Sequence, residues 1–281
     1  MPPVPQHIIA QQVRAALQED IGRGDVTAAL LDPRQRAAAH VISREAGILC
    51  GTAWFNEVFH QLDASIRVDW SVSDGEALSP NQQLCQLHGP THALLTGERT
   101  ALNFLQTLSG TATITQRFVK AMGDSGTRLL DTRKTVPGLR LAQKYAVTCG
   151  GGHNHRLGLY DMVLIKENHI ASCGSVTAAV HTAQQHHPTL PIEVEVESLA
   201  QLLEAIAAGA QRILLDNFTP EQLHEAVSTA KGRAELEISG NVTLANIGEL
   251  ARIGVDYIST GAITKHVTAL DLSMRITSVA K

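Results

Sequence analysis

One stretch of the chain, residues 129–169, gathers side chains that bind anions. It reads LLDTRKTVPGLRLAQKYAVTCGGGHNHRLGLYDMVLIKENH. Its basic and imidazole side chains are Arg133, Lys134, Arg140, Lys144, Arg156, Lys166, His153, His155 and His169. Arginine binds a carboxylate or phosphate through a two-point fork, and lysine supplies a point charge. Because the whole protein has a formal net charge of −4, this concentration of cations predicts a small ligand with several negative charges.

The residues of this stretch do not all contribute equally. Those that we expect around the ligand are Arg133, Lys134, Arg156 and Lys166. The run Gly150–Gly152 would let the backbone bend close to it. Arg140 and Lys144, one helical turn apart, indicate a solvated helix face. His153 and His155 lie two apart on a loop, which is a weak metal motif, and we do not expect zinc there.

The elements that must position these residues form a repeating pattern from about residue 128 onward. Short β-rich segments occupy 127–131, 161–167, 191–197, 211–216, 234–239 and 255–260. Between them, apolar residues recur at helical spacing, with Ser198 and Thr219 as N-caps and Gly209 and Gly232 as stops. Strands that alternate with single helices predict parallel βα units. Six units favour an open, incomplete (β/α) barrel, with a doubly wound open sheet as the alternative.

The first third of the chain has a different pattern. Residues 37–51 and 64–89 indicate strands joined by turns, with SDGE (73–76) as one turn. Residues 91–110 predict a helix. Its apolar stripe consists of Leu94, Leu95, Leu102, Leu105 and Leu108. We therefore predict an α+β domain over 1–110, an α/β barrel domain over 111–267, and a tail, 268–281, that packs back on the first domain.

Composition narrows the class of protein. Hydrophobic residues make up 44% and charged residues 18%, as in ordinary globular proteins. The pI near 6.3 argues against a general nucleic-acid binder. We find no apolar run of the ~20 residues that a membrane span needs and no secretory signal. The cysteines show no CxxC spacing, which predicts reduced thiols in a cytoplasmic protein, with two disulfides as the alternative. They are Cys50, Cys85, Cys149 and Cys173.

Every predicted strand of the barrel ends in polar residues. In chain order these are Asp131 to Lys134, Lys166 and Glu167, Glu195 and Glu197, Asp216 and Asn217, Ser239 to Asn241, and Thr260 and Gly261. Barrel enzymes carry their active sites at the carboxyl ends of the strands. Six such ends in register predict an active-site mouth rather than ordinary strand termination.

Two further patterns point to this mouth. Glu193, Glu195 and Glu197 share one face of a strand, and buried carboxylates need partners. Either that face meets basic residues on helices, or at least one glutamate lies beside a cation or metal in the mouth; we favour the second interpretation. After the last two strands, SGN (239–241) and STGA (259–262) each precede a helical pattern, and their backbone N–H groups predict anion-binding turns.

These segments resemble quinolinate phosphoribosyltransferase, also called nicotinate-nucleotide pyrophosphorylase (carboxylating), in order along nearly the whole chain. The long signature begins at Leu130. The other matching segments are EDIGRGDVT (19–27), GERTALNFLQTLSGTAT (97–113), EVEVES (193–198), LLDNF (214–218), ISGNV (238–242) and STGAITKHV (259–267). The resemblance implies the type II phosphoribosyltransferase fold and a homodimer. It also implies that, with Mg²⁺, 5-phosphoribosyl 1-pyrophosphate and quinolinate give nicotinate mononucleotide, pyrophosphate and CO₂ in NAD synthesis.

The resemblance also implies roles for individual residues. Quinolinate and the adjoining phosphates would be surrounded by Thr132, Arg133, Lys134, His155, Arg156 and Lys166. The 5-phosphate would lie on Ser239, Gly240, Asn241, Thr260, Gly261 and Ala262. Glu195 and Asp216 would hold the ribose hydroxyls and magnesium, and Arg99 would reach the site from the partner subunit.

A dicarboxylate and a polyphosphate account for the cations, the anion-binding turns and the acids. In the mechanism that we expect, the pyridine nitrogen attacks the anomeric carbon while magnesium pyrophosphate departs. Glu195 and Asp216 stabilise the positive charge on the sugar. The ring N⁺ then makes the 2-carboxylate a leaving group, and Lys166 or Lys134 donates the replacing proton. This makes Lys134, Lys166, Glu195 and Asp216 the catalytic candidates, with no protein nucleophile.

Three other functions fit parts of the pattern. Lys166 at a strand end is compatible with a Schiff-base aldolase that has the same phosphate turns. A relative of the same fold, found alongside molybdate transporters, would choose another substrate. A non-enzymatic anion-binding protein would not need Glu195 and Asp216 placed for a metal.

Overall fold

The computed structural model describes residues 4–280 and divides into two compact units. The first unit contains the chain up to Gln116, Val136–Gly151 and the chain from His266 onward; the second contains Arg117–Thr135 and Gly152–Lys265. The sequence patterns place one boundary near residue 110, where the structure has the middle of the long helix α3 (Thr91–Met122). The chain therefore passes from one unit to the other within a continuous helix.

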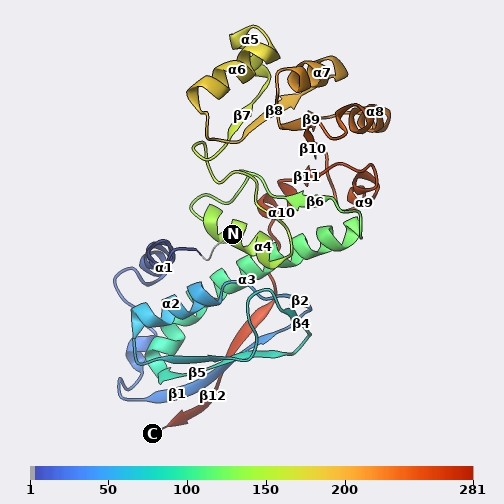
Figure 1. Cartoon of the computed structure of the whole chain (residues 1–281). Coiled ribbons are helices and arrows are strands. Elements are labelled where there is room, and N and C mark those ends of the chain that lie inside the picture. The colour runs from blue at the N-terminus through green and yellow to red at the C-terminus, as the bar shows by residue number, and fades with distance from the viewer. Residues whose placement is uncertain (1–3, 281) are drawn as a thin grey trace. The chain divides into compact units, whose positions relative to one another are not determined.

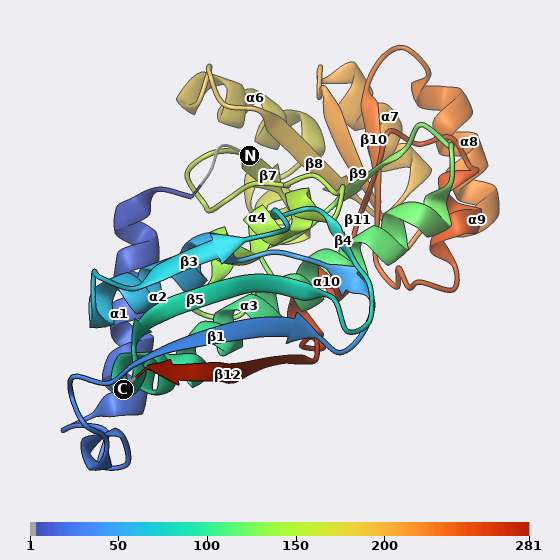
Figure 2. The ribbon, with the colours of Figure 1, turned by 90° about the horizontal axis from the view of Figure 1, so that it is seen from below.

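The first unit is built on an antiparallel sheet of four strands in the order β12-β1-β5-β3 (Figure 2). These strands are β1 (Arg36–Ser43), β3 (Arg67–Trp70), β5 (Gln83–Pro90) and β12 (Leu272–Ala280). A second, two-stranded sheet pairs β2 (Gly47–Ile48) with β4 (Ala77–Leu78). The predicted turn at 73–76 is present, since the Glu76 N–H donates to the Ser73 carbonyl at 3.1 Å.

Helices complete the first unit: α1 (Gln6–Ile21), the short 3₁₀ helix η1 (Ala28–Leu30), α2 (Thr52–Leu62), the first part of α3, and α4 (Arg140–Cys149). The core joins aromatic residues of α2 to leucines of β5 and α3. Of the predicted apolar stripe on α3, Leu95 is the exception. It is 39% exposed, because adjacent residues on a helix point about 100° apart and its neighbour Leu94 occupies the core face.

The prediction of a solvated face on α4 is wrong for Lys144. Its side chain is 0% exposed, although Arg140, one turn earlier, is partly exposed. The reason is a wide buried face, on which Ala142, Ala146 and Val147 are also buried. From the sequence alone, a lysine at this position is expected to be exposed to solvent.

The second unit contains six parallel strands (Figure 1). They are β6 (Arg128–Leu130), β7 (Val163–Ile165), β8 (Ile192–Val196), β9 (Arg212–Asp216), β10 (Glu235–Ser239) and β11 (Tyr257–Ser259). Their order, β6-β11-β10-β9-β8-β7, pairs the first strand with the last and otherwise follows the chain. A doubly wound sheet would reverse its order at a switch point. The order is thus that of a barrel left open between β6 and β7.

The helices of the second unit alternate with its strands as predicted from β8 onward, but two helices follow β7 instead of one, and the helix after β6, α4, belongs to the first unit. They are α5 (Glu167–Cys173), α6 (Val176–His186), α7 (Leu199–Ala207), α8 (Pro220–Ala230), α9 (Ile247–Ala251) and α10 (Ala262–Lys265). Both predicted N-caps are confirmed: Ser198 accepts the Gln201 N–H, and Thr219 accepts the Gln222 N–H. Among the residues described, no helix combines the length and apolar character needed to cross a bilayer.

Candidate active site

A pocket of about 230 Å³ lies at the carboxyl ends of the barrel strands. It is lined by Thr132, Arg133, Lys134, His155, Arg156, Leu164, Lys166, Glu195, Leu214, Glu237, Ser239 and Ser259. All of these residues belong to the second unit. Residues from strands β7 to β11, and from the loop after β6, therefore meet at one place, as expected for an active-site mouth.

Eight of the lining residues are predicted site residues, and they include all four cations expected around the ligand. The remaining predicted residues are not among those that line the pocket. Asp216, Gly240 and Asn241 follow β9 and β10, and Thr260 to Ala262 follow β11. Arg99 lies in the first unit, exposed on α3.

The loop after β6 is held so that Lys134 stands at the pocket. The Lys134 N–H donates to the Thr132 hydroxyl at 3.0 Å, and the Thr264 hydroxyl donates to the Lys134 carbonyl at 2.8 Å. Gly261 packs beneath the lysine, where a Cβ atom would come within 2.9 Å of the Lys134 Cδ. The turn after β11 is therefore shaped to fit the lysine-bearing loop.

The turns after β9 and β10 are also shaped against each other. Asn217, Gly240 and Asn241 have positive φ angles of 56°, 88° and 51°. The Asn241 amide donates to the Asn217 Oδ1 at 3.3 Å, and a Cβ on Gly240 would lie 2.4 Å from that oxygen. Asp216 lies in the same group, because its side chain accepts from the Asn217 amide at 2.9 Å. Only a residue without a side chain fits at position 240.

The expected helix after Ser239–Asn241 begins later than the sequence suggests. Helix α9 starts at Ile247, and only the four-residue α10 follows its turn directly, at Ala262. Asn246 occupies the intervening turn, donating from its side chain to the Asn241 carbonyl at 3.0 Å. Backbone N–H groups of a turn, rather than a helix terminus, are therefore available after β10.

The segment that carries His155 and Arg156 is anchored by Asp131 at the end of β6. The buried Asp131 carboxylate accepts the His155 N–H at 2.9 Å and the Asn154 amide at 2.7 Å. Just before them, the His153 N–H donates to the Leu129 carbonyl at 2.8 Å, so that the segment runs beside β6. His153 itself is exposed whereas His155 is buried, so the two do not form one site.

Both ring nitrogens of His155 are engaged by the protein. Nδ1 accepts the Arg156 backbone N–H at 2.7 Å, and Nε2 lies 2.7 Å from the Glu193 carboxylate. Because Nδ1 is an acceptor, the proton of a neutral ring lies on Nε2 and is donated to Glu193. His155 therefore lines the pocket while holding the backbone of Arg156 in place.

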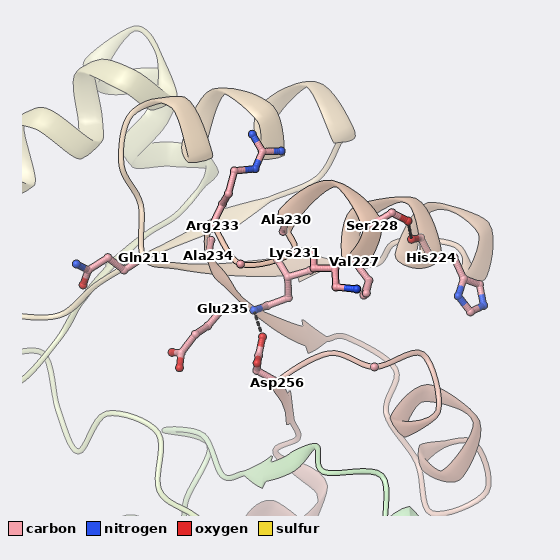
Figure 3. Close-up of a pocket in the computed structure, with 13 residues that line it drawn as sticks. Gln211, His224, Val227, Ser228, Ala230, Lys231, Arg233, Ala234, Glu235 and Asp256 are labelled. Carbon is pink, nitrogen blue, oxygen red and sulfur yellow. Dashed lines mark hydrogen bonds between the residues drawn. The ribbon is translucent and has the colours of Figure 1, made fainter.

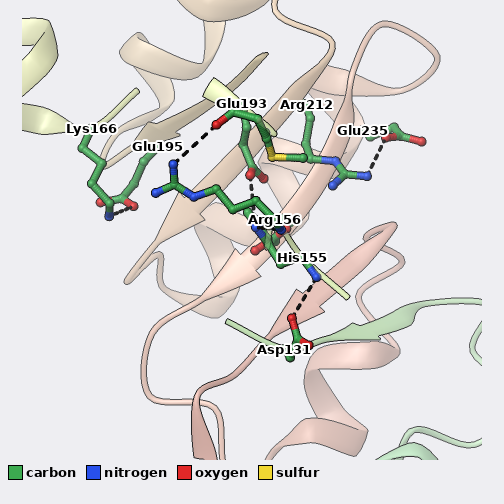
Figure 4. A network of polar contacts seen from close by, with 10 residues as sticks. Asp131, His155, Arg156, Lys166, Glu193, Glu195, Arg212 and Glu235 are labelled. Atoms are coloured by element: carbon green, nitrogen blue, oxygen red, sulfur yellow. Dashed lines mark hydrogen bonds and ion pairs between the residues drawn. The ribbon is translucent and has the colours of Figure 1, made fainter. Parts of the chain in front are cut away.

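Two buried glutamates, Glu193 and Glu237, lie next to the His155 ring, and Figure 4 shows the contact between Glu193 and His155. Both side chains are 0% exposed, and the Glu237 carboxylate lies 3.6 Å from His155 Nε2. Burial raises the pKa of Glu193 to about 7, and burial together with the charge of Glu193 raises the pKa of Glu237 to about 8. Removal from water disfavours the charged form of a carboxyl group, so Glu237 is largely protonated at neutral pH.

Glu237 was not among the predicted site residues, although a signal for it exists. Glu235 and Glu237 alternate in β10 as Glu193 and Glu195 do in β8. Parallel strands covered on both faces are usually almost wholly apolar. Alternating acids in two strands of one sheet thus indicate a polar barrel interior.

Lys166 and Glu195 form an ion pair at the mouth (Figure 4). The Lys166 side chain is 41% exposed and that of Glu195 is 12% exposed. Lys166 stands between the end of β7 and the start of α5, where its backbone N–H donates to His169 Nδ1 at 2.9 Å. One glutamate of the 191–197 segment thus lies beside a cation in the mouth, as the favoured interpretation of that segment predicted.

The cations of the pocket exceed its acids. Burial and the neighbouring Arg133 lower the pKa of the Arg156 guanidinium, which indicates that positive charge is crowded here. The lining contains four cations and two glutamates, and Glu237 is largely protonated. A ligand with several negative charges would relieve this excess.

A larger hollow, of about 980 Å³, lies at the opposite ends of the strands (Figure 3). It is lined by the end of α8, the following turn and the start of β10, including Lys231, Arg233, Glu235 and Asp256. The Asp256 carboxylate accepts the Leu236 N–H at 2.8 Å. Its two cations and two acids leave no excess charge, and the amino ends of barrel strands serve stability rather than chemistry.

Comparison with known proteins shows the family to which the chain belongs. Residues 25–109 match the family model "Quinolinate phosphoribosyl transferase, N-terminal domain", and residues 111–275 match the corresponding C-terminal domain. A probable nicotinate-nucleotide pyrophosphorylase [carboxylating] of Bacillus subtilis (strain 168) is 43% identical over 92% of this chain and 90% of its own. Quinolinate phosphoribosyltransferase [decarboxylating] 1 of Nicotiana glauca is 39% identical over 98% of this chain and 84% of its own.

A solved structure gives the same result for the fold. The nicotinate-nucleotide pyrophosphorylase from Francisella tularensis superimposes with a TM-score of 0.96 at 50% sequence identity. The match covers 98% of each chain, so both units have counterparts in that protein.

Proposed function

Because the chain belongs to the quinolinate phosphoribosyltransferase family, we propose that its reaction takes place in the pocket at the carboxyl ends of β6–β11. The activity is the decarboxylating transfer of a phosphoribosyl group to quinolinate, which forms nicotinate mononucleotide in NAD biosynthesis. The observation that carries the placement is the meeting of Arg133, Arg156 and Lys166 in one pocket of about 230 Å³.

Quinolinate carries two carboxylates on adjacent ring carbons, and the pocket offers matching donors. Arg133 and Arg156 provide forked guanidinium groups for carboxylates, and Lys134 and Lys166 add point charges. Thr132 offers a hydroxyl. We assign His155 a positioning role toward Arg156, since its ring nitrogens already have protein partners.

The second substrate, 5-phosphoribosyl 1-pyrophosphate, would lie across the turns after β9, β10 and β11. The 5-phosphate would accept backbone N–H groups of Ser239–Asn241 and Thr260–Ala262. Small residues let a phosphate approach the backbone closely, and Gly240 and Gly261 provide this closeness on the two turns.

Glu195 and Asp216 are the residues that would hold magnesium. They fit this ion because they are partly exposed carboxylates at the ends of the adjacent strands β8 and β9, and Mg²⁺ favours hard oxygen ligands. When bound, magnesium would neutralise charge on the pyrophosphate leaving group.

The ion pair between Lys166 and Glu195 suggests how the site responds to quinolinate. A substrate carboxylate competes for the Lys166 ammonium, and the Glu195 carboxylate is then released toward the sugar. As the pyridine nitrogen attacks the anomeric carbon, positive charge develops on the ribose, and Glu195 and Asp216 stabilise it electrostatically. No protein side chain needs to form a bond to the sugar.

Loss of CO₂ follows from the new charge on the ring nitrogen. The electron pair left at carbon 2 lies beside N⁺, which stabilises it, and a proton must then replace the carboxylate. Lys166 and Lys134 are the lysines of the pocket, and we propose that the ammonium group of one of them donates that proton. This reaction does not require Lys166 to form a Schiff base.

We further propose a homodimer in which Arg99 of each subunit completes the site of the other. Arg99 is a cation exposed on α3. Mixed dimers of an Arg99→Ala subunit and a Lys134→Ala subunit would regain about one working site, as expected for a shared site. Mixed dimers that stay inactive would contradict the sharing.

The reaction itself is tested with purified protein, 5-phosphoribosyl 1-pyrophosphate and magnesium, with either quinolinate or nicotinate as acceptor. We expect nicotinate mononucleotide from quinolinate alone, because the pocket has donors for two carboxylates. Product from nicotinate alone would contradict the assignment of the cations to a dicarboxylate.

A further inference from the structure

The first unit contains a pair of thiols that the phosphoribosyl reaction does not use. Cys50 lies between β2 and α2, and Cys149 is the last residue of α4. The two sulfurs and a carboxylate oxygen of Asp74 all lie within 4.8 Å of one another. All four cysteines of the chain are free thiols, so this pair has no disulfide. Folding thus brings together two residues that are far apart in sequence.

The two thiols have different environments. Cys50 is fully buried, whereas Cys149 is partly exposed. A hydrogen bond from the Cys50 thiol is the main cause that lowers the pKa of Cys149, while partial burial and the charge of Asp74 act in the opposite direction. Burial raises the pKa of Cys50. Because Cys149 is partly exposed and Cys50 is fully buried, a dissolved oxidant reaches Cys149 first, so Cys149 is the nucleophile of the pair and Cys50 its partner.

Asp74 is committed to other partners, which argues against a metal between these residues. Its Oδ1 accepts the backbone N–H groups of Gly51 and Thr52 at 3.1 and 3.2 Å, at the start of α2. Its Oδ2 accepts the Tyr145 hydroxyl at 3.0 Å. Two thiols without a free third ligand make a poor site for zinc, which prefers four.

We propose that Cys149 and Cys50 form a peroxide-reactive pair that closes to an intramolecular disulfide. The Cys149 thiolate attacks one oxygen of hydrogen peroxide; an S–O bond forms, the O–O bond breaks, and hydroxide leaves and takes up a proton as water. The Cys50 sulfur then attacks the Cys149 sulfenic acid. The S–S bond forms, the S–O bond breaks, and the second hydroxide leaves as water with the Cys50 proton.

The separation of the two sulfurs favours this closure. The sulfurs need only approach from within 4.8 Å to a bond length of about 2 Å, and both side chains turn about a single χ1 bond. The backbone beside Cys50 is fixed, because the Ser109 hydroxyl accepts the Cys50 N–H at 3.0 Å. The disulfide would tie the last turn of α4 to the start of α2, within the first unit.

The test is a peptide map of the full-length protein. Reduced protein is treated with a slight excess of hydrogen peroxide, its remaining thiols are alkylated, and it is digested without reductant and analysed by mass spectrometry. We expect one cross-linked peptide that joins Cys50 to Cys149, with a loss of about 2 Da. Cys85, which is buried, and Cys173, which is exposed, serve as internal comparisons and should remain alkylatable thiols.

Two variants assign the order of the steps. In Cys50→Ser, Cys149 should accumulate as sulfenic acid that a dimedone probe traps; in Cys149→Ser, Cys50 should stay reduced. The wild-type map decides the proposal even if a variant fails to fold. Oxidation of Cys173 ahead of Cys149, or peroxide-treated protein without the Cys50–Cys149 link, would overturn it. So would metal bound to the untreated protein that is released when these two thiols are alkylated.

Discussion

The two ends of the barrel strands differ both in the size of their cavities and in the balance of charge. At the carboxyl ends, a pocket of about 230 Å³ brings Arg133, Lys134, Arg156 and Lys166 against only Glu195 and Glu237. At the amino ends, a hollow of about 980 Å³ sets Lys231 and Arg233 against Glu235 and Asp256. The larger cavity is balanced and the smaller one has an excess of positive charge. Unbalanced charge, rather than volume, therefore marks the place where an anionic substrate binds.

The largest expected effect comes from replacing Lys166 at the carboxyl ends of the strands. Lys231 at the amino ends provides the control. Lys166→Ala should lower kcat/KM by roughly 10²–10³-fold, because it removes a charge that faces the reacting centre. Lys231→Ala should change it less than about twofold, since single exposed charges contribute little. Steady-state kinetics with quinolinate varied measures both. Equal losses of kcat/KM in the two variants would contradict the claim that the substrate binds at the carboxyl ends of the strands.

Replacing one arginine at each end of the strands distinguishes an effect on quinolinate binding from an effect on catalysis. Arg156→Ala should raise the KM for quinolinate about 10- to 100-fold, because a hydrogen bond to a charged group contributes about 1.5–3 kcal/mol. Arg156→Lys should recover part of this, since it restores the charge without the fork. Arg233→Ala is the matched control and should leave this KM unchanged. If Arg156→Ala altered only kcat, the carboxylate would have another partner.

Two glycines with positive φ angles provide a finer comparison. Gly240 has φ +88° and a Cβ there would meet Asn217 Oδ1 at 2.4 Å, whereas Gly232 has φ +72° and open space around it. Substitution by alanine should cost each about 1 kcal/mol through backbone strain, and at position 240 the contact with Asn217 adds to this cost. Only Gly240→Ala should also raise the KM for 5-phosphoribosyl 1-pyrophosphate, by about tenfold. An unchanged KM would show that the turn after β10 does not hold this substrate.

The last comparison concerns stability alone. A glutamate in the unfolded chain titrates near 4.5, and the pKa of Glu237 in the folded protein is about 8. Between these values the folded state keeps a proton that the unfolded chain loses, so the free energy of unfolding falls as pH rises from about 4.5 to about 8. Glu237→Gln should remove this part of the decline and stabilise the protein at pH 9 by about 1–3 kcal/mol.

The matched control for that change is Glu235→Gln. Glu235 is 52% exposed and pairs with Arg212 at 3.3 Å, so its replacement should alter stability by at most about 1 kcal/mol. Denaturant unfolding at pH 6 and pH 9 measures both variants. A wild-type protein that is equally stable at the two pH values would mean that Glu237 is not a buried, protonated acid.

Much of the second unit follows from its sequence. Strand and helix patterns alternate strongly, and caps such as Ser198 and Thr219 mark helix starts by a local interaction that needs no tertiary context. The cations of the pocket were found from residue type and from their positions at strand ends. These features depend on neighbours along the chain.

Features that depend on packing were not accessible in the same way. The burial of Lys144, the exposure of Leu95 and the late start of α9 at Ile247 are set by what packs against each segment. Likewise, Glu237 joins Glu193 and His155 only because the strand order places β10 and β8 on either side of β9. The partition of the chain into units was also hidden, because α3 continues through the boundary without a break.

The most direct test of the site is a crystal structure of the protein with quinolinate bound. We predict that both carboxylates lie in the pocket at the carboxyl ends of the strands, within hydrogen-bonding distance of Arg133, Arg156 and Lys166. The Lys166–Glu195 ion pair should be opened by the substrate. Quinolinate in the hollow at the amino ends, or a carboxylate without a cationic partner, would contradict the site.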